Sequence, residues 1–449
     1  MSAGPNLSFM SRRAVLGGST CALGFSFSSV LVHADTARGS SASMVLRNWF
    51  KLVLELVRHT ATYSPPVASR SFAYLGITAH EVMATSNPLL RSLAGQVTAL
   101  APLPDAAIPA SHDPAITLNA ALSKAVRHFF GNTGPSGQRA MDRMQARLTE
   151  SSSDMVSPER ATNSQNFGDA IADHIIDWSA SDGGAAVENM GFPVVWTVSA
   201  EPGRWVPTST IGQQQAPLLP TWGQNRAFSM PQGSLCPLPP PPAYSEDPDS
   251  EFYAEAFEVA QITGSLTEEQ KFIARFWSDD PMLSPTPPGH WIAILLQIAD
   301  RDDMPAERLG EGLALLGIGL ADAFIACWHE KFVHDLIRPV TYIRQQIDPA
   351  WQPLLITPPF PEYPSGHSTQ SGAAATVLTA FLGDDFAFTD TTHEDEGLDA
   401  RSYPDFWTAA EEAGISRLYG GIHFRSAIER GLEQGRCVGD YATRLQTLA

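Results

Sequence analysis

Apolar residues recur at helical spacing along most of this chain, and this periodicity limits the fold more than any other feature. In residues 44–60 one helical face carries the apolar side chains Val45, Trp49, Leu52, Val53 and Leu56. The same pattern predicts further helices near residues 68–84, 118–130, 137–150, 160–179, 250–263, 267–278, 289–301, 306–333, 366–382, 405–420 and 427–446. No stretch shows a convincing alternation of period two, so we predict an all-α fold.

One long segment interrupts the helical pattern. Residues 183–250 are rich in Pro, Gly, Gln and Trp and include five prolines between Pro237 and Pro242. A connection of this length without regular structure usually either has a function or acts as a linker. We therefore predict an irregular wrapping segment here, placed between an N-terminal helical bundle of residues 35–182 and a C-terminal helical bundle of residues 251–449.

The most apolar stretch after the N-terminal region runs from Leu313 to Trp328. Asp322 interrupts it, and it is shorter than the roughly 20 apolar residues that a bilayer span needs. We therefore predict a central core helix and no stable membrane anchor.

The N-terminus has the pattern of an export signal. Arg12 and Arg13 precede an apolar run, and the residues up to Ala34 suit a cleavage site after Ala34. This pattern predicts a twin-arginine signal peptide over residues 1–34 and a mature protein that is periplasmic or secreted. A cytoplasmic N-terminal tail is the alternative interpretation.

The charge of the chain limits its partners. With 29 Lys and Arg against 48 Asp and Glu, the formal net charge is −19. Such a surface repels nucleic acid and anionic lipid on average, so we expect no nucleic-acid partner. The same acidity makes any local cluster of cations informative.

The four cysteines have no metal-type spacing. Cys21 falls in the predicted signal peptide, and Cys327 falls in the apolar core helix. Cys236 and Cys437 remain, and one disulfide between them would be compatible with an exported protein.

Three short segments of the C-terminal half combine residues that suit a bound anion: Lys331–Pro339, Pro364–His367 and Ser416–His423. Lys331 and Arg338 are seven residues apart, close to two helical turns, so both cations could point the same way. Two cations at one place on an acidic protein need an anion between them.

The other two segments add a helix N-terminus and two imidazoles. Ser365 can cap a helix and Gly366 lets a ligand approach the backbone, while His367 is placed to move a proton. Arg417 and His423 flank a pair of glycines, and a neutral His423 could bind a metal or attack phosphorus. Each segment alone also suits a purely structural role, but their ordered combination in one helical domain indicates an oxyanion site.

In order and spacing, these segments closely resemble the superfamily shared by vanadium-dependent haloperoxidases, type 2 phosphatidic acid phosphatases and bacterial acid phosphatases. By that resemblance His423 would be the axial ligand of vanadate and His367 the acid–base residue. The non-axial oxygens would be held by Lys331, Arg338, Ser365, Gly366 and Arg417. Phosphate could occupy the same site, because bipyramidal vanadate mimics the transition state of phosphoryl transfer.

Further similarities favour the haloperoxidase branch. Trp328 and Phe360 resemble the aromatic pair that lines the halide side of the pocket in chloroperoxidases. The segment Trp277-Ser278-Asp279 resembles a family stretch whose aspartate hydrogen-bonds the acid–base histidine, which indicates Asp279 and, less securely, Asp280. By this resemblance the fold would consist of two packed helical bundles.

One position departs from the family pattern. The family usually places an aspartate four residues after the axial histidine, and this chain has Ala427 there. Such a carboxylate orients the ligand histidine and fixes its tautomer, so its loss puts ligand affinity in question. Glu429 could substitute for it only if the local backbone allows its side chain to reach His423.

The resemblance predicts an enzyme with vanadate as cofactor, hydrogen peroxide and halide as substrates, and a small organic acceptor. Its product would be hypohalous acid or a halogenated compound. An exported acid phosphatase, acting through a phosphohistidine at His423, is the main alternative. A non-catalytic phosphate or vanadate binder is a third class.

Overall fold

The computed structural model describes residues 41–103, 111–153, 156–188, 195–209 and 215–449. Residues Gly39–Ala449 form one compact unit. The predicted signal peptide, residues 1–34, lies outside the described residues. The boundaries proposed between the two bundles remain a prediction.

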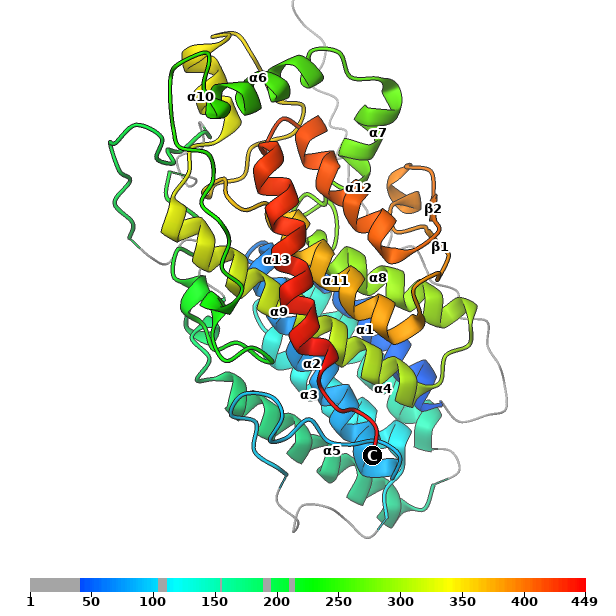
Figure 1. Ribbon diagram of the computed structural model, residues 1–449. Coiled ribbons are helices and arrows are strands. Elements are labelled where there is room, and N and C mark those ends of the chain that lie inside the picture. The colour runs from blue at the N-terminus through cyan, green and yellow to red at the C-terminus, as the bar shows by residue number, and fades with distance from the viewer. Residues whose placement is uncertain (1–40, 104–110, 154–155, 189–194, 210–214) are drawn as a thin grey trace, which may run out of the picture. The chain divides into compact units, whose positions relative to one another are not determined.

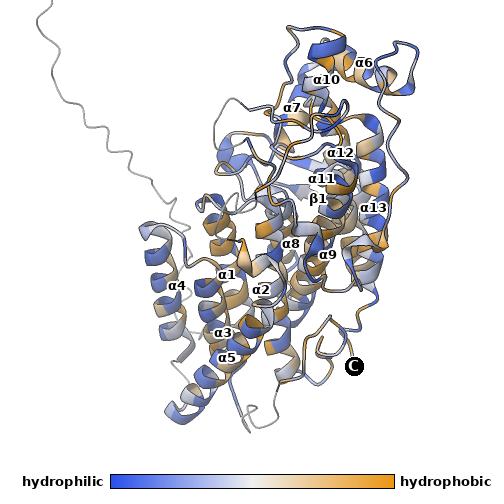
Figure 2. Cartoon of the chain, turned by 90° about the vertical axis from the view of Figure 1, so that its left-hand side faces the viewer, coloured by the Kyte–Doolittle hydropathy of each residue, from blue (hydrophilic) through white to orange (hydrophobic). Residues whose placement is uncertain are grey.

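The described chain is mostly helical, which confirms the predicted all-α class. Its N-terminal third forms five helices with bounds close to those predicted from periodicity: α1 (Ala42–Arg58), α2 (Pro65–Ser86), α3 (Pro114–Phe129), α4 (Pro135–Ser153) and α5 (Pro158–Ser179). Four of the five have proline at their start, and the side chains of Ser41, Asp113 and Ser157 cap α1, α3 and α5. Figure 2 shows α4 as largely hydrophilic, in agreement with the few residues that it buries.

Helix α9 (Ala306–His334) runs through the centre of the molecule (Figure 1). In the part of the chain that the structure describes, it alone is long and apolar enough to cross a membrane, but its apolar window is entirely buried inside the structure. This burial confirms the predicted central core helix. The carboxylate of Asp322, which interrupts the apolar stretch, accepts hydrogen bonds from the backbone nitrogens of Phe228, Ser229 and Met230.

Close helix crossings fix the position of α9. A Cβ atom at Gly76 of α2 would overlap the carbonyl of Leu313, and one at Gly317 would come within 2.9 Å of the Ala73 backbone. The missing side chains therefore let the two helices touch along their backbones, which buries apolar surface on both.

The C-terminal part adds α8 (Thr286–Arg301), α11 (Gly366–Leu382), α12 (Phe406–Tyr419) and α13 (Arg425–Thr443). Helices α11 and α13 pack side by side against α9, as Figure 1 shows. A Cβ atom at Gly435 of α13 would overlap the carbonyl of Thr369 in α11. This close approach holds α13 against the first turn of α11.

The smaller elements surround one end of these helices. They are α6 (Glu251–Thr263), α7 (Glu268–Phe276), α10 (Pro339–Gln346) and a hairpin of β1 (Phe388–Asp390) and β2 (Arg401–Tyr403). Helix α10 and the hairpin were not predicted. A second apolar cluster, separate from the main core, joins α6 and α10 to the start of α13 through residues such as Phe252, Tyr342 and Phe424.

The described parts of residues 183–250 contain only short 3₁₀ turns, as predicted for the irregular segment. The backbone nitrogen of Trp205 donates to Asp335, and that of Leu218 donates to Pro359. The segment thus lies against the end of α9 and the loop before α11. A disulfide joins Cys236 of this segment to Cys437 of α13, which confirms the pairing left open by the sequence.

Candidate functional site

The predicted anion-binding residues converge from four elements. Lys331 lies in the last turn of α9, Arg338 directly precedes α10, Arg417 lies near the end of α12, and His423 lies in the loop before α13. All four side chains are buried. The structure therefore gathers these residues, far apart in sequence, in one region of the interior.

Lys331 and Arg338 do not share a helix, contrary to the helical spacing argument. Helix α9 ends at His334, and Asp335 adopts the left-handed conformation with φ +47°, which turns the chain. The two cations nevertheless flank the same ring: the Lys331 ammonium lies 5.2 Å and the Arg338 guanidinium 4.9 Å from the centroid of Phe360.

The ammonium of Lys331 is held by backbone carbonyls. It donates to Pro361 and Glu362, each at 2.9 Å, and to Pro364. These acceptors belong to the loop before α11, so the lysine ties this loop to α9. Burial lowers the pKa of Lys331 to about 7.

The two arginines also donate mainly to carbonyls. Arg338 donates from Nε to Phe360 and from Nη1 to Ile422, while its Nη2 has no hydrogen-bond partner among the described residues. Arg417 donates to the Ser416 hydroxyl and to the Trp277 carbonyl. Burial lowers the pKa of each guanidinium to about 10.

The electrostatic consequence is the main feature of the site. Within the described residues, none of these three buried cations has a carboxylate oxygen within ion-pair distance. Their side-chain nitrogens donate instead to backbone carbonyls, the Ser416 hydroxyl or the His423 ring. Buried charges in proteins are normally paired, because desolvation of an isolated charge is expensive. An anion that contacts all three cations would supply the missing charge.

The N-terminus of α11 lies next to these cations. Ser365 caps this helix by accepting from the Ser368 backbone nitrogen at 3.3 Å, as predicted from the Pro-Ser-Gly-His sequence. A Cβ atom at Gly366 would meet nothing closer than 3.7 Å, so the protein's own packing does not require glycine there. The helix start thus places backbone donors next to the three cations.

His423 is held as a neutral imidazole with a defined tautomer. Its Nδ1 lies 2.8 Å from Oε1 of Glu362, and its Nε2 lies 3.2 Å from Nη1 of Arg338. Because the guanidinium can only donate, Nε2 must be the acceptor and Nδ1 must carry the proton. Burial and then the charge of Arg338 hold the pKa of His423 well below its usual value.

The sequence did not indicate Glu362 as the partner of His423. Glu429, the acidic substitute considered from the sequence, lies 3.9 Å from Arg425 and its side chain is 62% exposed. Ala427 is buried, and its carbonyl accepts from the Ser365 backbone nitrogen. Glu429 therefore does not substitute for the missing aspartate. No local signal points to Glu362, which is 61 residues from His423.

His367 lies close to Asp279, but not in hydrogen-bond contact with it. Its Nε2 is 3.9 Å from Oδ2 of Asp279, and neither atom has a hydrogen-bond partner among the described residues. Burial and then the charge of Arg417 hold the pKa of His367 well below its usual value, so it is neutral. The hydrogen bond expected from the resemblance is replaced by this longer approach.

Asp279 instead belongs to a buried network of acids and histidines. Its Oδ1 accepts from His290 at 2.9 Å and from His393 at 3.2 Å, and the other nitrogen of His290 lies 2.7 Å from Asp390. Burial opposes these charges, but the two carboxylates raise the pKa of His290 to about 10. The protonated His290 therefore bridges two carboxylates.

This network was not predicted. Asp390 and His393 fall in the acidic run of residues 384–399, and such charge runs are usually solvated. Asp390 is fully buried because β1 turns it toward α8. Ligand atoms of Asp279, His290 and His393 lie within 4.8 Å of one another, but a metal ion could bind there only if His290 lost a proton.

The predicted aromatic pair lies beside the cations. The ring centroids of Trp328 and Phe360 are 5.0 Å apart, and the Trp328 indole nitrogen donates to the carbonyl of Leu218. Both rings border the Lys331 ammonium. The pair thus forms an apolar wall next to the cationic groups.

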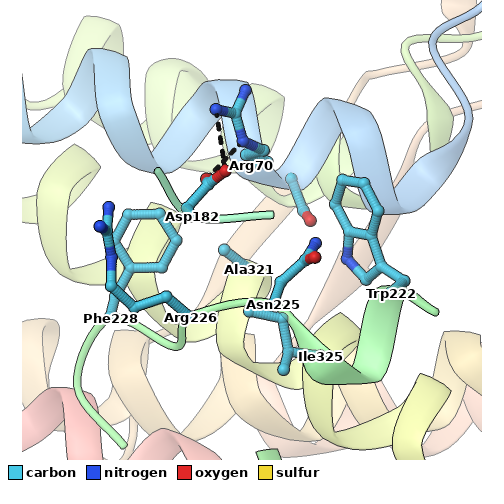
Figure 3. Close-up of a pocket in the computed structure, with 9 residues that line it drawn as sticks. Arg70, Asp182, Trp222, Asn225, Arg226, Phe228, Ala321 and Ile325 are labelled. Atoms are coloured by element: carbon cyan, nitrogen blue, oxygen red, sulfur yellow. Dashed lines mark hydrogen bonds and ion pairs between the residues drawn. The ribbon is translucent and has the colours of Figure 1, made fainter. Parts of the chain in front are cut away.

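A small cavity elsewhere provides a contrast (Figure 3). It is lined by residues of α2, of the irregular segment and of α9, among them Arg70, Trp222 and Ala321. Here the guanidinium of Arg70 lies 2.6 Å from Asp182 and also contacts Glu188, so its charge is already neutralised. The cavity does not have the charge pattern of an anion site.

Fold and site together define an all-helical oxyanion-binding protein with one neutral histidine facing three cations. Residues 312–448 match the family model described as the VCPO second helical-bundle domain. The vanadium chloroperoxidase of Curvularia inaequalis is 28% identical over 131 residues, which cover 24% of this chain and 22% of that protein.

Solved structures extend the similarity over the whole fold. The first bacterial vanadium-dependent iodoperoxidase is 36% identical, with a TM-score of 0.81 over 90% of this chain and 96% of that chain. A holo-type bacterial vanadium-dependent chloroperoxidase has the same fold, with 16% identity and a TM-score of 0.66 over 87% of this chain and 93% of that one. The chain belongs to the vanadium-dependent haloperoxidase family.

Proposed function

We propose that the protein oxidises halide with hydrogen peroxide at a vanadate-loaded site. The observation that supports this most directly is the group of three buried cations, Lys331, Arg338 and Arg417, without an acidic partner among the described residues. The net reaction consumes a halide, hydrogen peroxide and a proton, and yields hypohalous acid and water. A small organic acceptor would then take the halogen.

The residues present fit a vanadate ion. Nη2 of Arg338 and Nε2 of His367 are buried without hydrogen-bond partners in the described chain, so both can bond to an oxyanion. His423 would coordinate vanadium through Nε2, and the oxygens would be held by Lys331, Arg338, Ser365, Gly366 and Arg417. When bound, vanadate would supply a Lewis acid that activates hydrogen peroxide without itself changing oxidation state.

The protein groups would then direct the protons. A neutral His367 can accept a proton from hydrogen peroxide and return it to the leaving oxygen. Lys331 is held by three carbonyls, and its positive charge can polarise the oxygen that the halide attacks. Trp328 and Phe360 would exclude water on the side where the halide enters.

The direct test is a halogenation assay with a phenol dye. Full-length protein freed of bound anions should halogenate the dye only with vanadate and hydrogen peroxide, and chloride, bromide and iodide are compared in parallel. The variant His423→Ala should lose turnover, whereas His174→Ala, which alters a half-buried imidazole bonded to Ala101, should keep it.

Other outcomes would assign the site differently. Hydrolysis of p-nitrophenyl phosphate that vanadate inhibits, without any halogenation, would indicate a phosphatase acting through His423. Tight vanadate binding without turnover of either substrate would indicate a binding protein. Unchanged halogenation by His423→Ala would contradict both enzyme hypotheses.

We also propose that residues 1–34 direct twin-arginine export to the periplasm or beyond. The disulfide between Cys236 and Cys437 supports an oxidising compartment. Replacing Arg12 and Arg13 by lysine should retain the protein in the cytoplasm of a bacterial host, whereas the unchanged protein should be recovered outside the cytoplasm and begin after Ala34. Equal export of both forms would contradict the proposal.

A further inference from the structure

The partner of His423 in this chain comes from an unexpected segment. The family pattern usually supplies an aspartate four residues after the ligand histidine, and Ala427 stands there. In the structure Oε1 of Glu362 lies 2.8 Å from Nδ1 of His423, and both side chains are buried. Glu362 lies two residues before the Pro-Ser-Gly-His segment and 61 residues before His423.

We propose that Glu362 orients His423 and fixes its tautomer. The proton is then on Nδ1, and the lone pair of Nε2 points toward the three cations. This inference rests on the proposed binding of vanadate by His423. Glu362 acts through His423 and is therefore a positioning residue.

The contacts of Glu362 support a dedicated role. Its Oε1 also accepts from the Phe424 backbone nitrogen at 2.9 Å, so the same atom holds both the ligand ring and the backbone that follows it. Its Oε2 has no hydrogen-bond partner among the described residues. Among the described residues, the side chain thus accepts hydrogen bonds only from residues 423 and 424.

The backbone of Glu362 links the same side chain to the cations. Its carbonyl accepts from the Lys331 ammonium at 2.9 Å, and its nitrogen donates to Leu336 at 3.0 Å. One residue therefore sets the distance between the ligand histidine and one of the cations. A histidine ligand held in this way loses less rotational freedom on binding, and its Nε2 becomes a stronger electron-pair donor to a metal.

A comparison of phosphate binding with vanadate binding distinguishes this positioning role from general support of the fold. Phosphate would be held only by charge and hydrogen bonds from the cations, whereas vanadate would in addition be bound through Nε2 of His423. Removal of the positioning contact should therefore weaken vanadate binding much more than phosphate binding.

The experiment measures the dissociation constants of orthovanadate and inorganic phosphate by calorimetry on the full-length protein. Glu362→Ala should weaken vanadate about 10- to 100-fold and phosphate less than about threefold. Glu362→Gln keeps an acceptor oxygen and should stay within about threefold of the unchanged protein for both anions. The matched control Glu429→Gln, on the exposed face of α13, should change neither constant.

The outcomes are distinguishable. If the unchanged protein binds phosphate but not vanadate, the proposed function fails. If it binds vanadate and Glu362→Ala binds it equally well, or loses both anions equally, the role of Glu362 is refuted. Should the alanine variant not fold, Glu362→Asp, which withdraws the oxygen by one methylene, should bind vanadate more weakly than Glu362→Gln, and equal affinities would refute the proposal.

Discussion

The buried ion network around His290 predicts an unusual dependence of stability on pH. Asp390→Asn keeps Oδ1, which accepts from the nitrogen and hydroxyl of Thr392, but replaces Oδ2 with an NH₂ group facing His290. The variant therefore removes one of two carboxylates from a protonated imidazole while preserving the local turn. Asp279 and His393 also belong to the network, and Glu396 lies 3.4 Å from His393 and His367 3.9 Å from Asp279.

The sign and size follow from the pKa of His290. Its pKa is raised from 6.5 to about 10, so its contribution is fully present below pH 6.5 and is lost as the pH rises through about 10. The difference of about 3.5 units corresponds to roughly 5 kcal/mol at 1.36 kcal/mol per unit. If the two carboxylates contribute about equally, Asp390→Asn should remove roughly 2 kcal/mol of this pH-dependent part.

Urea unfolding of the disulfide-bonded protein, followed by tryptophan fluorescence at pH 6.5, 8 and 10, would measure this. Asp390→Asn should lower the free energy of unfolding by about 3–5 kcal/mol at the lowest pH, and the difference should shrink by roughly 2 kcal/mol at the highest. Asp385→Asn, on the exposed part of the same loop, is the control and should follow the unchanged protein. Because other groups titrate equally in both proteins, a constant difference across the three pH values would refute a protonated His290.

Three further predictions concern the site and its support. His367→Ala should lower kcat by about 10²–10⁴ while the vanadate dissociation constant from calorimetry stays within about threefold; a loss of affinity instead would make His367 a binding residue. Phe360→Ala should raise KM for halide more than KM for hydrogen peroxide in steady-state assays, and equal changes would argue against an aromatic halide wall. Cys437→Ser opens a disulfide that spans 201 residues and should lower the free energy of urea unfolding by about 5 kcal/mol; an unchanged midpoint would indicate that the helices alone hold α13 in place.

The sequence predicted most of the helices because their signal is local. Periodicity is carried by side chains three and four residues apart, so α9 or α11 can be recognised without knowledge of their partners. Helix α10 has only eight residues and begins at the proline of an arginine-proline pair, and each strand of the β1–β2 hairpin has three residues. Elements this short contain too few repeats of the pattern to be recognised.

The cations and His423 were predicted for the same reason, since each lies in a short segment of recognisable composition. Their carboxylate partners were not. Glu362 lies 61 residues from His423, and Asp390 lies 100 residues from His290. Whether two such residues meet depends on loop paths that tertiary packing sets, and no periodic signal reports that packing.

The irregular segment supplies part of that packing. The Leu218 backbone accepts from the Trp328 indole and donates to Pro359, which lies in the same loop as Phe360 and Glu362. The loop that carries the positioning carboxylate is therefore held between α9 and a segment with no regular structure. A residue such as Leu218 can support the ligand histidine without touching it, because the hydrogen bonds of its backbone, and not its side chain, fix the loop. The cations and His423 could therefore be predicted from three short motifs, whereas the residues that orient them could be identified only in the folded structure.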